Sequence, residues 1–344
     1  MRELFKKLHD TLVSGGDAVL VSVVASSGST PRGSGARMLI TAEGRVRGTI
    51  GGGAVEYRSE QMAAEVLKNK SSFVENFRLN AEDVAKLGMI CGGAVDVYFR
   101  YIPASDADTI ALTERIEALF AAGEQCWLLC ELAAGSEGKM AVYGAKSGWF
   151  GGKVPEGMAE KLGSKPAQMD IGGSVWYTEE LLRPGRVFVF GGGHVAQELV
   201  PALARVGFRC VVIEDRPDFA KPELFQGVEE TRLIAVDELP KIAKEVTKDD
   251  YVCIMTRGHK DDFEVQRWIL GTPARYIGVI GSANKKKGVF DRLRAYGYTD
   301  ADFARVTAPI GLDIGGETPA EIAVSITAQL IMVRAGRPAG SWGV

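Results

Sequence analysis

One stretch of the chain, residues 187–216, reads VFVFGGGHVAQELVPALARVGFRCVVIEDR and decides the fold. It begins with an apolar run, passes through three glycines into an amphipathic segment, and ends with a second apolar run that closes on acidic residues. The order of strand, glycine turn, helix, strand and acid is typical of a Rossmann unit that binds a dinucleotide. The stretch therefore predicts a nucleotide-type ligand, or a pterin that carries a phosphate.

Five residues of this stretch have predicted roles. We expect Gly191 to allow the tight turn and Gly193 to let the backbone approach a phosphate closely. His194 stands at the start of the helix, where free N–H groups and a partial positive charge attract an anion. Asp215 follows the second strand, where an acid accepts from a ribose, and the adjacent Arg216 leaves NAD and NADP undecided. The alternative is a turn kept for packing alone.

From residue 184 onward, apolar runs alternate regularly with amphipathic segments. This pattern predicts a Rossmann-like, doubly wound parallel α/β sheet over residues 184–344. Ligands of such sheets collect at the carboxyl ends of the strands. The candidate binding residues at these positions are Gly191, Gly193, His194, Asp215, Arg216, His259, Gly281 and Ser282.

Residues 1–183 mix predicted helices and strands without that regular alternation, which indicates an N-terminal mixed α/β (α+β) domain. A glycine-rich loop in this domain, residues 28–37, contains Arg32 and Arg37. The planar guanidinium group of arginine suits phosphate or carboxylate. We therefore expect both arginines to contact a cofactor.

A second glycine-rich turn in the N-terminal domain resembles Gly191–Gly193, because it also leads directly into a predicted helix. Gly51, Gly52 and Gly53 precede this helix, and successive backbone N–H groups there predict a second nest for an anion. Glu56 lies in the first turn of the helix. It either belongs to this binding site or only complements the helix dipole.

The chain has five cysteines, an odd number without regular spacing, which favours a reducing cytoplasm over a disulfide framework. Four of them lie in apolar runs and are expected in the core: Cys126, Cys130, Cys210 and Cys253. Cys91 instead lies beside two glycines that cannot shield it. It is the candidate for a reactive thiol or a metal ligand, and the alternative is a small packing residue.

Composition excludes several classes of protein. The net charge of −3 over 344 residues offers no basic field that would recruit nucleic acid or an anionic membrane. The first residues lack the uninterrupted apolar core of a signal peptide. No run approaches the length of about 18 apolar residues that a membrane span requires. We therefore expect a cytoplasmic protein without membrane or nucleic-acid partners.

Several motifs in both domains resemble the XdhC/CoxI family, the accessory factors of xanthine dehydrogenase and related molybdenum hydroxylases. The N-terminal half has SSGSTPRGSGARMLI, GRVRGTIGGGAVE and CGGAVDVYF, and the C-terminal half has VFGGGHVAQEL, VVIEDRPDFA, DDYVCIMTRGHKDD, ARYIGVIGSANKK and APIGLDIGGETPAEIAVSI. These motifs cover both domains in order, whereas residues 103–183 match least.

The resemblance implies a maturation factor without turnover chemistry of its own. Such a factor binds the molybdenum cofactor, of the molybdopterin type, supports its sulfuration with a cysteine desulfurase, and delivers it to an apo molybdenum hydroxylase. Some family members have a cysteine after the first glycine triplet, where this chain has Ala54. That departure moves any thiol role, including temporary ligation of the metal, to Cys91.

Two other functions remain open from the sequence. The Rossmann half is also compatible with an NAD(P)-dependent oxidoreductase, in which His194 or His259 would move protons. It is equally compatible with a binding module regulated by another nucleotide. We also expect a homodimer, because glycine-rich clefts in two domains must be closed against each other or against a partner, and dimerisation is the commonest solution.

Overall fold

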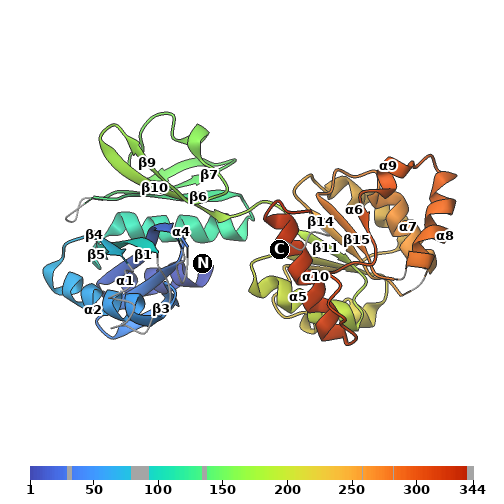
Figure 1. Cartoon of the computed structure of the whole chain (residues 1–344), viewed down its shortest axis with the longest axis horizontal. Helices are drawn as coiled ribbons and strands as arrows, with labels where there is room; N and C mark the ends of the chain where they lie inside the picture. The colour runs from blue at the N-terminus through green and yellow to red at the C-terminus, as the bar shows by residue number, and fades with distance from the viewer. Residues whose placement is uncertain (29–32, 79–92, 134–137, 258, 282, 339–344) are drawn as a thin grey trace. The chain divides into compact units, whose positions relative to one another are not determined.

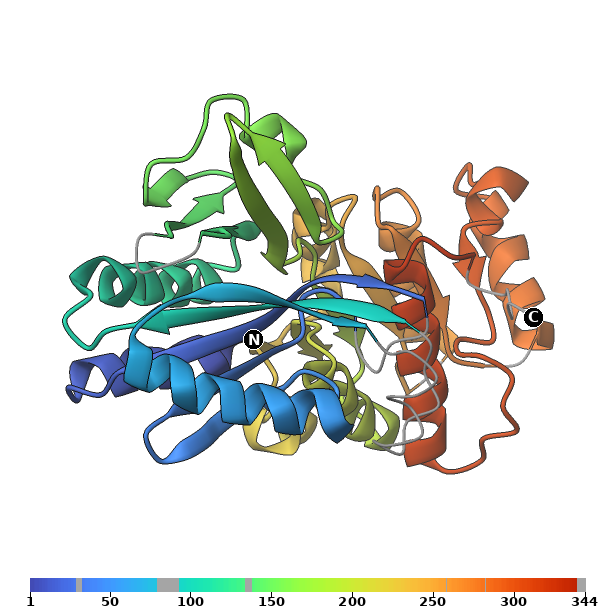
Figure 2. The same ribbon diagram turned by 60° about the vertical axis from the view of Figure 1, so that its left-hand side comes forward.

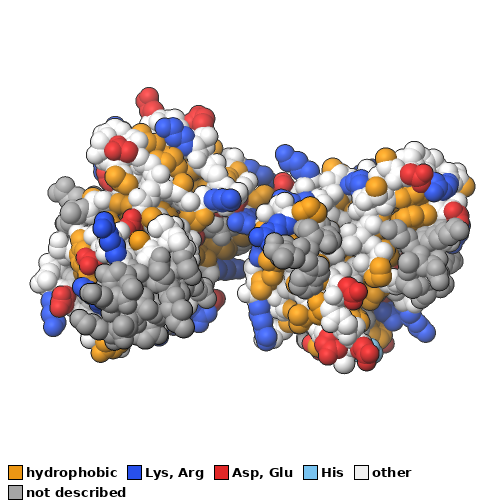
Figure 3. Space-filling model, viewed as in Figure 1, with side chains coloured by type: hydrophobic (Ala, Val, Ile, Leu, Met, Phe, Trp, Pro, Cys, Tyr) orange, Lys and Arg blue, Asp and Glu red, His pale blue; other side chains and the backbone are white. Residues whose placement is uncertain are grey.

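The computed structural model describes the chain except residues 29–32, 79–92, 134–137, 258, 282 and 339–344, and it gives only the backbone for 259–261 and 283–287. The chain divides into two compact units, Met1–Arg183 and Pro184–Val344 (Figure 1). Among the described helices, none is both long and apolar enough to cross a membrane. The face seen in Figure 3 carries acidic and basic side chains interspersed on each unit, as the small net charge predicts.

The C-terminal unit contains a six-stranded sheet in the order β13-β12-β11-β14-β15-β16, with every neighbouring pair parallel. Its strands are β11 (Val187–Phe190), β12 (Cys210–Glu214), β13 (Glu230–Leu233), β14 (Tyr251–Ile254), β15 (Tyr276–Val279) and β16 (Val306–Thr307). The chain starts in the middle of the sheet, builds outward to one side, and returns to build the other. The predicted doubly wound Rossmann sheet is confirmed, and the switch of direction lies between β11 and β14.

Helices cover both faces of this sheet, because side chains alternate along each buried strand. Phe188 and Phe190 of β11 pack on the face covered by α6 (Leu239–Glu245), α7 (His259–Ile269), α8 (Ala283–Arg294) and α9 (Asp300–Phe303). Val187 and Val189 pack on the other face, against α5 (His194–Arg205) and α10 (Pro319–Arg334). Near-continuous apolar runs are therefore required in these strands.

The sixth strand of this sheet was not predicted from the sequence. β16 has only two residues, and a run this short carries no periodicity from which a strand could be recognised.

The helix α10 begins with a capping box. The hydroxyl of Thr318 accepts from the Glu321 N–H, and the carboxylate of Glu321 accepts from the Thr318 N–H.

The N-terminal unit contains two antiparallel five-stranded sheets, in the orders β3-β2-β1-β5-β4 and β8-β7-β6-β10-β9. The first is formed by β1 (Ala18–Ser27), β2 (Arg37–Thr41), β3 (Gly44–Thr49), β4 (Phe73–Arg78) and β5 (Ala94–Ile102). The second is formed by β6 (Cys126–Glu131), β7 (Met140–Gly144), β8 (Gly148–Gly151), β9 (Ala167–Ile171) and β10 (Ser174–Leu182). The predicted mixture of helices and strands is confirmed.

Three helices complete the layers of this unit. Both α1 (Arg2–Val13) and α4 (Ala107–Ala121) contribute to a core that also includes one face of each sheet, whereas α2 (Gly53–Asn69) packs on the opposite face of the first sheet. Figures 1 and 2 show α4 between the two sheets. The buried residues of α1 are spaced for one apolar face: Leu4, Phe5, Leu8 and Leu12.

Candidate functional site

The glycine turn of the C-terminal unit joins β11 to α5. Gly191 has φ 103°, and a Cβ atom there would lie 2.5 Å from the carbonyl oxygen of Met255. A Cβ atom at Gly192 would lie 2.3 Å from the carbonyl oxygen of Phe219. These two glycines are therefore required by the backbone itself, as the sequence predicts for Gly191.

The third glycine faces open space. A Cβ atom at Gly193 would have no neighbour within 4 Å, and its φ of −68° suits any residue. The N–H groups of His194, Val195 and Ala196 have no hydrogen-bond partner among the described residues, and Gly193 offers no side chain to cap them. This end of α5 is a ready position for an anion.

The buried acid at the end of β12 is Glu214, the residue before Asp215. The carboxylate of Glu214 accepts from the Gly192 N–H at 2.6 Å and from the N–H groups of Asp215 and Arg216 at 3.0 and 3.1 Å. The sequence contains a signal for this, since Glu214 has the same strand parity as Val212, which faces α5. Glu214 thus ties the glycine turn to the neighbouring strand.

Arg216 completes this arrangement. Its Nε and Nη2 atoms donate to the two carboxylate oxygens of Glu214 at 2.9 and 2.8 Å, and its guanidinium carbon lies 4.0 Å from the ring centre of Phe219. Burial alone would raise the pKa of Glu214, but the hydrogen bonds from Arg216 and the backbone outweigh burial and lower that pKa to about 2. Glu214 is therefore an anion at neutral pH, and Arg216 is its counterion.

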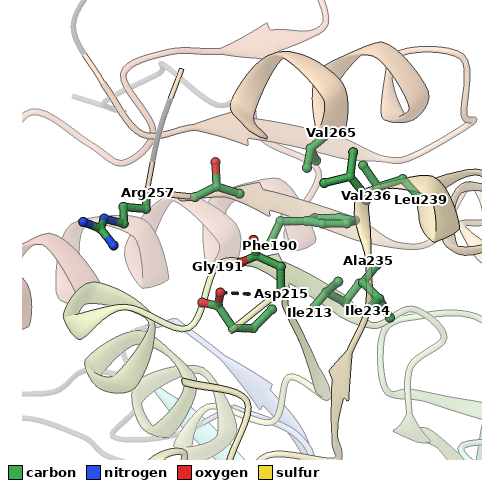
Figure 4. Close-up of a pocket in the computed structure, with 12 residues that line it drawn as sticks. Phe190, Gly191, Ile213, Asp215, Ile234, Ala235, Val236, Leu239, Arg257 and Val265 are labelled. Atoms are coloured by element: carbon green, nitrogen blue, oxygen red, sulfur yellow. Dashed lines mark hydrogen bonds between the residues drawn. The ribbon is translucent and has the colours of Figure 1, made fainter. Parts of the chain in front are cut away.

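A hollow opens at the carboxyl edge of the sheet, where ligands of doubly wound sheets bind. It is lined by Phe190, Gly191, Ile213, Glu214, Asp215, Ile234, Ala235, Val236, Leu239, Thr256, Arg257 and Val265. Figure 4 shows the aliphatic side chains on one side of the hollow and Arg257 on the other. The Asp215 side chain, which is 55% exposed, lies at this edge.

The remaining predicted residues of the C-terminal unit do not line this hollow in the described structure. His194 is exposed at the start of α5, and Gly281 follows β15 with φ 133°. The side chain of His259 and the whole of Ser282 lie outside the described residues. The aliphatic wall of the hollow, formed by Ile213, Ile234, Val236 and Leu239, was not predicted from the sequence. Ile234 and Val236 follow the edge strand β13, and nothing in the local sequence distinguishes them from other apolar residues.

In the glycine turn of the N-terminal unit, unlike that of the C-terminal unit, the acid that binds the backbone comes from the helix that follows the turn. Gly51, Gly52 and Gly53 have φ values of 130°, 77° and 66°, so three consecutive residues adopt conformations that favour glycine. The carboxylate of Glu56 accepts from the N–H groups of Ile50 and Gly52 at 2.9 and 3.1 Å. A carboxylate of the chain itself therefore occupies the nest that the sequence predicted for an external anion.

Further groups hold this carboxylate in place. The hydroxyl of Thr49 and the guanidinium of Arg45 both donate to Glu56, and Arg45 also pairs with Glu60 at 3.0 Å. Burial would raise the pKa of Glu56, but hydrogen bonds from Thr49 and the backbone, with the charge of Arg45, lower it to about 2. The charge of Glu56 opposes the approach of a second anion.

Arg37 is not in the exposed loop that the sequence suggested. It begins β2, its side chain is 1% exposed, and its guanidinium pairs with Glu179 at 2.6 Å and donates to Ser22 at 3.1 Å. A second hollow lies beside this pair and is lined by Gly33, Ser34, Gly35, Ala36, Ser164, Pro166, Glu179, Glu180 and Arg183. Arg37 thus supports the wall of this N-terminal hollow through Glu179. Arg32 lies outside the described residues.

The four described cysteines are all buried, as predicted. Burial raises the pKa of Cys126 and of Cys210 to about 12, and it raises the pKa of Cys130 and Cys253 as well. These thiols therefore stay protonated at neutral pH. Cys91 lies outside the described residues, and the described part of the chain contains no cluster of metal-ligating side chains.

The fold and the hollow define a two-unit α/β protein with a Rossmann domain, whose glycine turn leaves Gly193 open. The family model of the XdhC Rossmann domain matches residues 187–330, and that of the XdhC and CoxI family matches residues 12–78. The chain belongs to the XdhC and CoxI family.

Three relatives extend this comparison over nearly the whole chain. The uncharacterized protein YqeB of Escherichia coli (strain K12) is 25% identical over 93% of this chain, which spans 44% of that relative's length. A relative from Bacillus subtilis (strain 168), named as a probable xanthine dehydrogenase subunit, is 24% identical, with 92% of this chain and 93% of the relative covered. A crystal structure of a xanthine dehydrogenase from Bacillus halodurans has 25% identity and a TM-score of 0.77, covering 97% of this chain and 96% of that one.

Proposed function

We propose that this protein is an accessory factor that binds the molybdenum cofactor, supports its sulfuration, and delivers it to a xanthine dehydrogenase-type hydroxylase. Membership of the XdhC and CoxI family supports the accessory role, as do the xanthine dehydrogenase names of two relatives. The protein would act as a maturation factor rather than as an enzyme. Its partners would be the apo hydroxylase and a cysteine desulfurase.

The observation that carries this proposal is the open Rossmann turn beside an apolar hollow. The cofactor combines a flat pterin ring with a phosphate or a nucleotide. Aliphatic side chains such as Ile234 and Val236 suit a flat ring, and the N–H groups at the start of α5 suit a phosphate. The residues present therefore fit the phosphate end of such a cofactor.

The N-terminal unit would hold the reactive end. Burial removes Cys126, Cys130, Cys210 and Cys253 from consideration as sulfur carriers or ligands of the metal. We therefore retain Cys91 for this role and Arg32 for contact with the cofactor. The described residues of the loop around Arg32, Gly33 to Ala36, border the N-terminal hollow.

Cofactor binding by variants of the full chain tests this proposal. Arg32→Ala should weaken retention of the molybdenum cofactor about 10- to 100-fold, the usual effect of losing one charge-assisted hydrogen bond. Cys91→Ser should fold normally and fail to activate a client hydroxylase. The matched controls are Arg58→Ala, at an exposed arginine of α2, and Cys210→Ala, at a buried thiol. Normal binding and normal activation by both test variants would overturn the proposed site.

A homodimer is part of the same proposal. Closed symmetric dimers are the commonest assembly of soluble oligomeric proteins. Light scattering across micromolar concentrations should therefore give twice the chain mass of 36.9 kDa. A value that stays at the chain mass would contradict the dimer.

A further inference from the structure

We infer that the Rossmann hollow selects a nucleoside diphosphate group whose ribose has a free 2′-hydroxyl, and that it discriminates against a 2′-phosphate. Such a group occurs in free dinucleotides and in nucleotide-bearing forms of a pterin cofactor. The inference rests on the hollow itself and does not require that the protein handles a molybdenum cofactor.

The base would occupy the aliphatic part of the hollow. Ile213 ends the buried part of β12, Ile234 and Val236 follow β13, and Leu239 begins α6. Figure 4 shows these side chains gathered on one side of the hollow. A flat heteroaromatic ring between them would remove apolar surface from water without placing a charge there.

Two acids decide what the ribose can carry. Glu214 and Asp215 both line the hollow at the end of β12, where an acid of a Rossmann unit contacts the ribose hydroxyls. Glu214 is anionic but already accepts five hydrogen bonds, so Asp215 is the residue placed to accept from the 2′-hydroxyl. Arg216 balances the charge of Glu214 and its Nε lies 4.0 Å from Oδ1 of Asp215, so a phosphate in the same position would still meet one net negative charge.

No arginine is positioned to reverse this preference among the residues that line the hollow on the β12 side. Arg216 lies beside both acids, with its Nε 4.0 Å from Oδ1 of Asp215, but its guanidinium already donates to Glu214 and stacks on Phe219, and it does not line the hollow. Arg257 does line the hollow, but it follows β14, on the other side of β11 from β12. It therefore lies toward the diphosphate rather than toward the ribose acids.

The diphosphate would lie against the open start of α5. The backbone at Gly193 is uncovered, the first N–H groups of the helix have no partner among the described residues, and Arg257 adds a positive charge. A Cβ atom at Gly193 would fill the space through which a phosphate approaches the backbone. The Gly193→Ala variant is expected to fold, since nothing lies within 4 Å of that position.

Titration calorimetry on the full-length protein tests the inference with two matched pairs of ligands. These are ADP-ribose with its 2′-phosphorylated form, and NAD⁺ with NADP⁺. We expect each 2′-hydroxyl ligand to bind at least about 10-fold more tightly than its phosphorylated partner. Equal or tighter binding of the phosphorylated ligands, or no binding of either pair, would overturn the inference.

Two variants assign the effect to the named residues. Asp215→Asn should reduce the preference about 3- to 10-fold, whereas Asp218→Asn should leave it unchanged, because Asp218 is 86% exposed and does not line the hollow. Gly193→Ala should weaken all four ligands by a similar factor. An unchanged preference in Asp215→Asn would refute the role of the acids.

A separate arm keeps this inference distinct from the proposed function. Molybdenum cofactor binding is measured on the same preparations, with and without saturating ADP-ribose. Loss of the proposed function would appear as no cofactor binding while the 2′-hydroxyl preference persists. Failure of the inference would appear as no preference, whether or not the cofactor binds.

Discussion

The two glycine turns of this protein have nearly the same sequence plan and opposite availability. In the N-terminal unit, Gly51–Gly53 leads into α2, and the carboxylate of Glu56 accepts the N–H groups of Ile50 and Gly52. In the C-terminal unit, Gly191–Gly193 leads into α5, and Gly192 is the one residue of the turn whose N–H donates to Glu214. The two turns thus differ in how many of their backbone N–H groups a carboxylate of the chain accepts.

The origin of the acid explains the difference. Glu56 belongs to the helix that follows its own turn, so its carboxylate folds back over the glycines. Glu214 instead comes from the neighbouring strand β12, and its carboxylate accepts from the N–H of Gly192. No atom lies within 4 Å of the position that a Cβ atom at Gly193 would take. A glycine triplet before a helix therefore marks an anion site only when no nearby carboxylate fills it.

The largest effect should come from removing the acid of the open turn. Glu214→Ala leaves Arg216 and the Gly192 N–H without their acceptor, and should lower the free energy of unfolding of the C-terminal unit by about 3 kcal/mol. Hydrogen exchange of peptides from this unit measures the loss. Asp218→Ala is the control and should change it by less than about 0.5 kcal/mol. Equal effects would refute the structural role of Glu214.

A comparison of glycines within the open turn should give a smaller effect. Gly191→Ala forces a side chain into a φ of 103° and against the carbonyl of Met255, so it should destabilise the C-terminal unit by about 1–3 kcal/mol. Gly193→Ala should cost less than about 0.5 kcal/mol, because its position is open. Urea denaturation of both variants gives the two values. A Gly193 variant as unstable as the Gly191 variant would show that the turn is closed.

The closed turn should respond to the loss of its own acid. Glu56→Gln should destabilise the N-terminal unit by about 1–3 kcal/mol at neutral pH, because buried N–H groups lose a charged acceptor. Glu60→Gln is a matched control, since Glu60 also pairs with Arg45 yet no described backbone N–H donates to it. It should cost less than about 0.5 kcal/mol. A similar loss of stability in both variants would mean that the ion pairs of Arg45, and not the hydrogen bonds to the turn, stabilise this unit.

The pH dependence of the closed turn has a definite sign. The folded-state pKa of Glu56 is about 2, below its ordinary value of about 4.5. Its contribution to stability is therefore fully present above about pH 5 and is lost as the pH falls toward 2. Hydrogen exchange of α2 peptides between these pH values should show this slope in the wild type. The slope should be reduced in Glu56→Gln, and an unchanged slope would contradict the assignment.

The smallest effect should be protection by a simple anion. Pyrophosphate at a concentration equal to its dissociation constant should stabilise the C-terminal unit by about 0.4 kcal/mol, and the carboxylate of Glu56 should keep it from the N-terminal turn. Hydrogen exchange of peptides spanning Gly193–Ala196 should slow, whereas those spanning Ile50–Gly53 should not change. Protection at the N-terminal turn instead would reverse the comparison.

Much of the C-terminal unit was predictable from local pattern. The strand Val187–Phe190 and the helix α5 lie where the order of apolar run, glycine turn and amphipathic segment predicts them. The short strand β16 was not predictable, because two residues carry no periodicity and pair only once β15 is in place. In the N-terminal unit, Arg37 was misplaced for a related reason: its partner Glu179 is distant in sequence, and no local signal reveals that pair.

Periodicity, glycine positions and capping residues are local properties, and they were enough to establish a Rossmann unit, a mixed N-terminal unit and four buried cysteines. The availability of each turn is not local. It depends on which carboxylate reaches the backbone N–H groups, and for the C-terminal turn that carboxylate comes from a neighbouring strand. The aliphatic wall of the hollow likewise joins the ends of β12 and β13 with the start of α6. Hydrogen bonds and apolar contacts between segments distant in sequence form only when the sheet assembles, so tertiary structure alone decides which turn can receive a ligand.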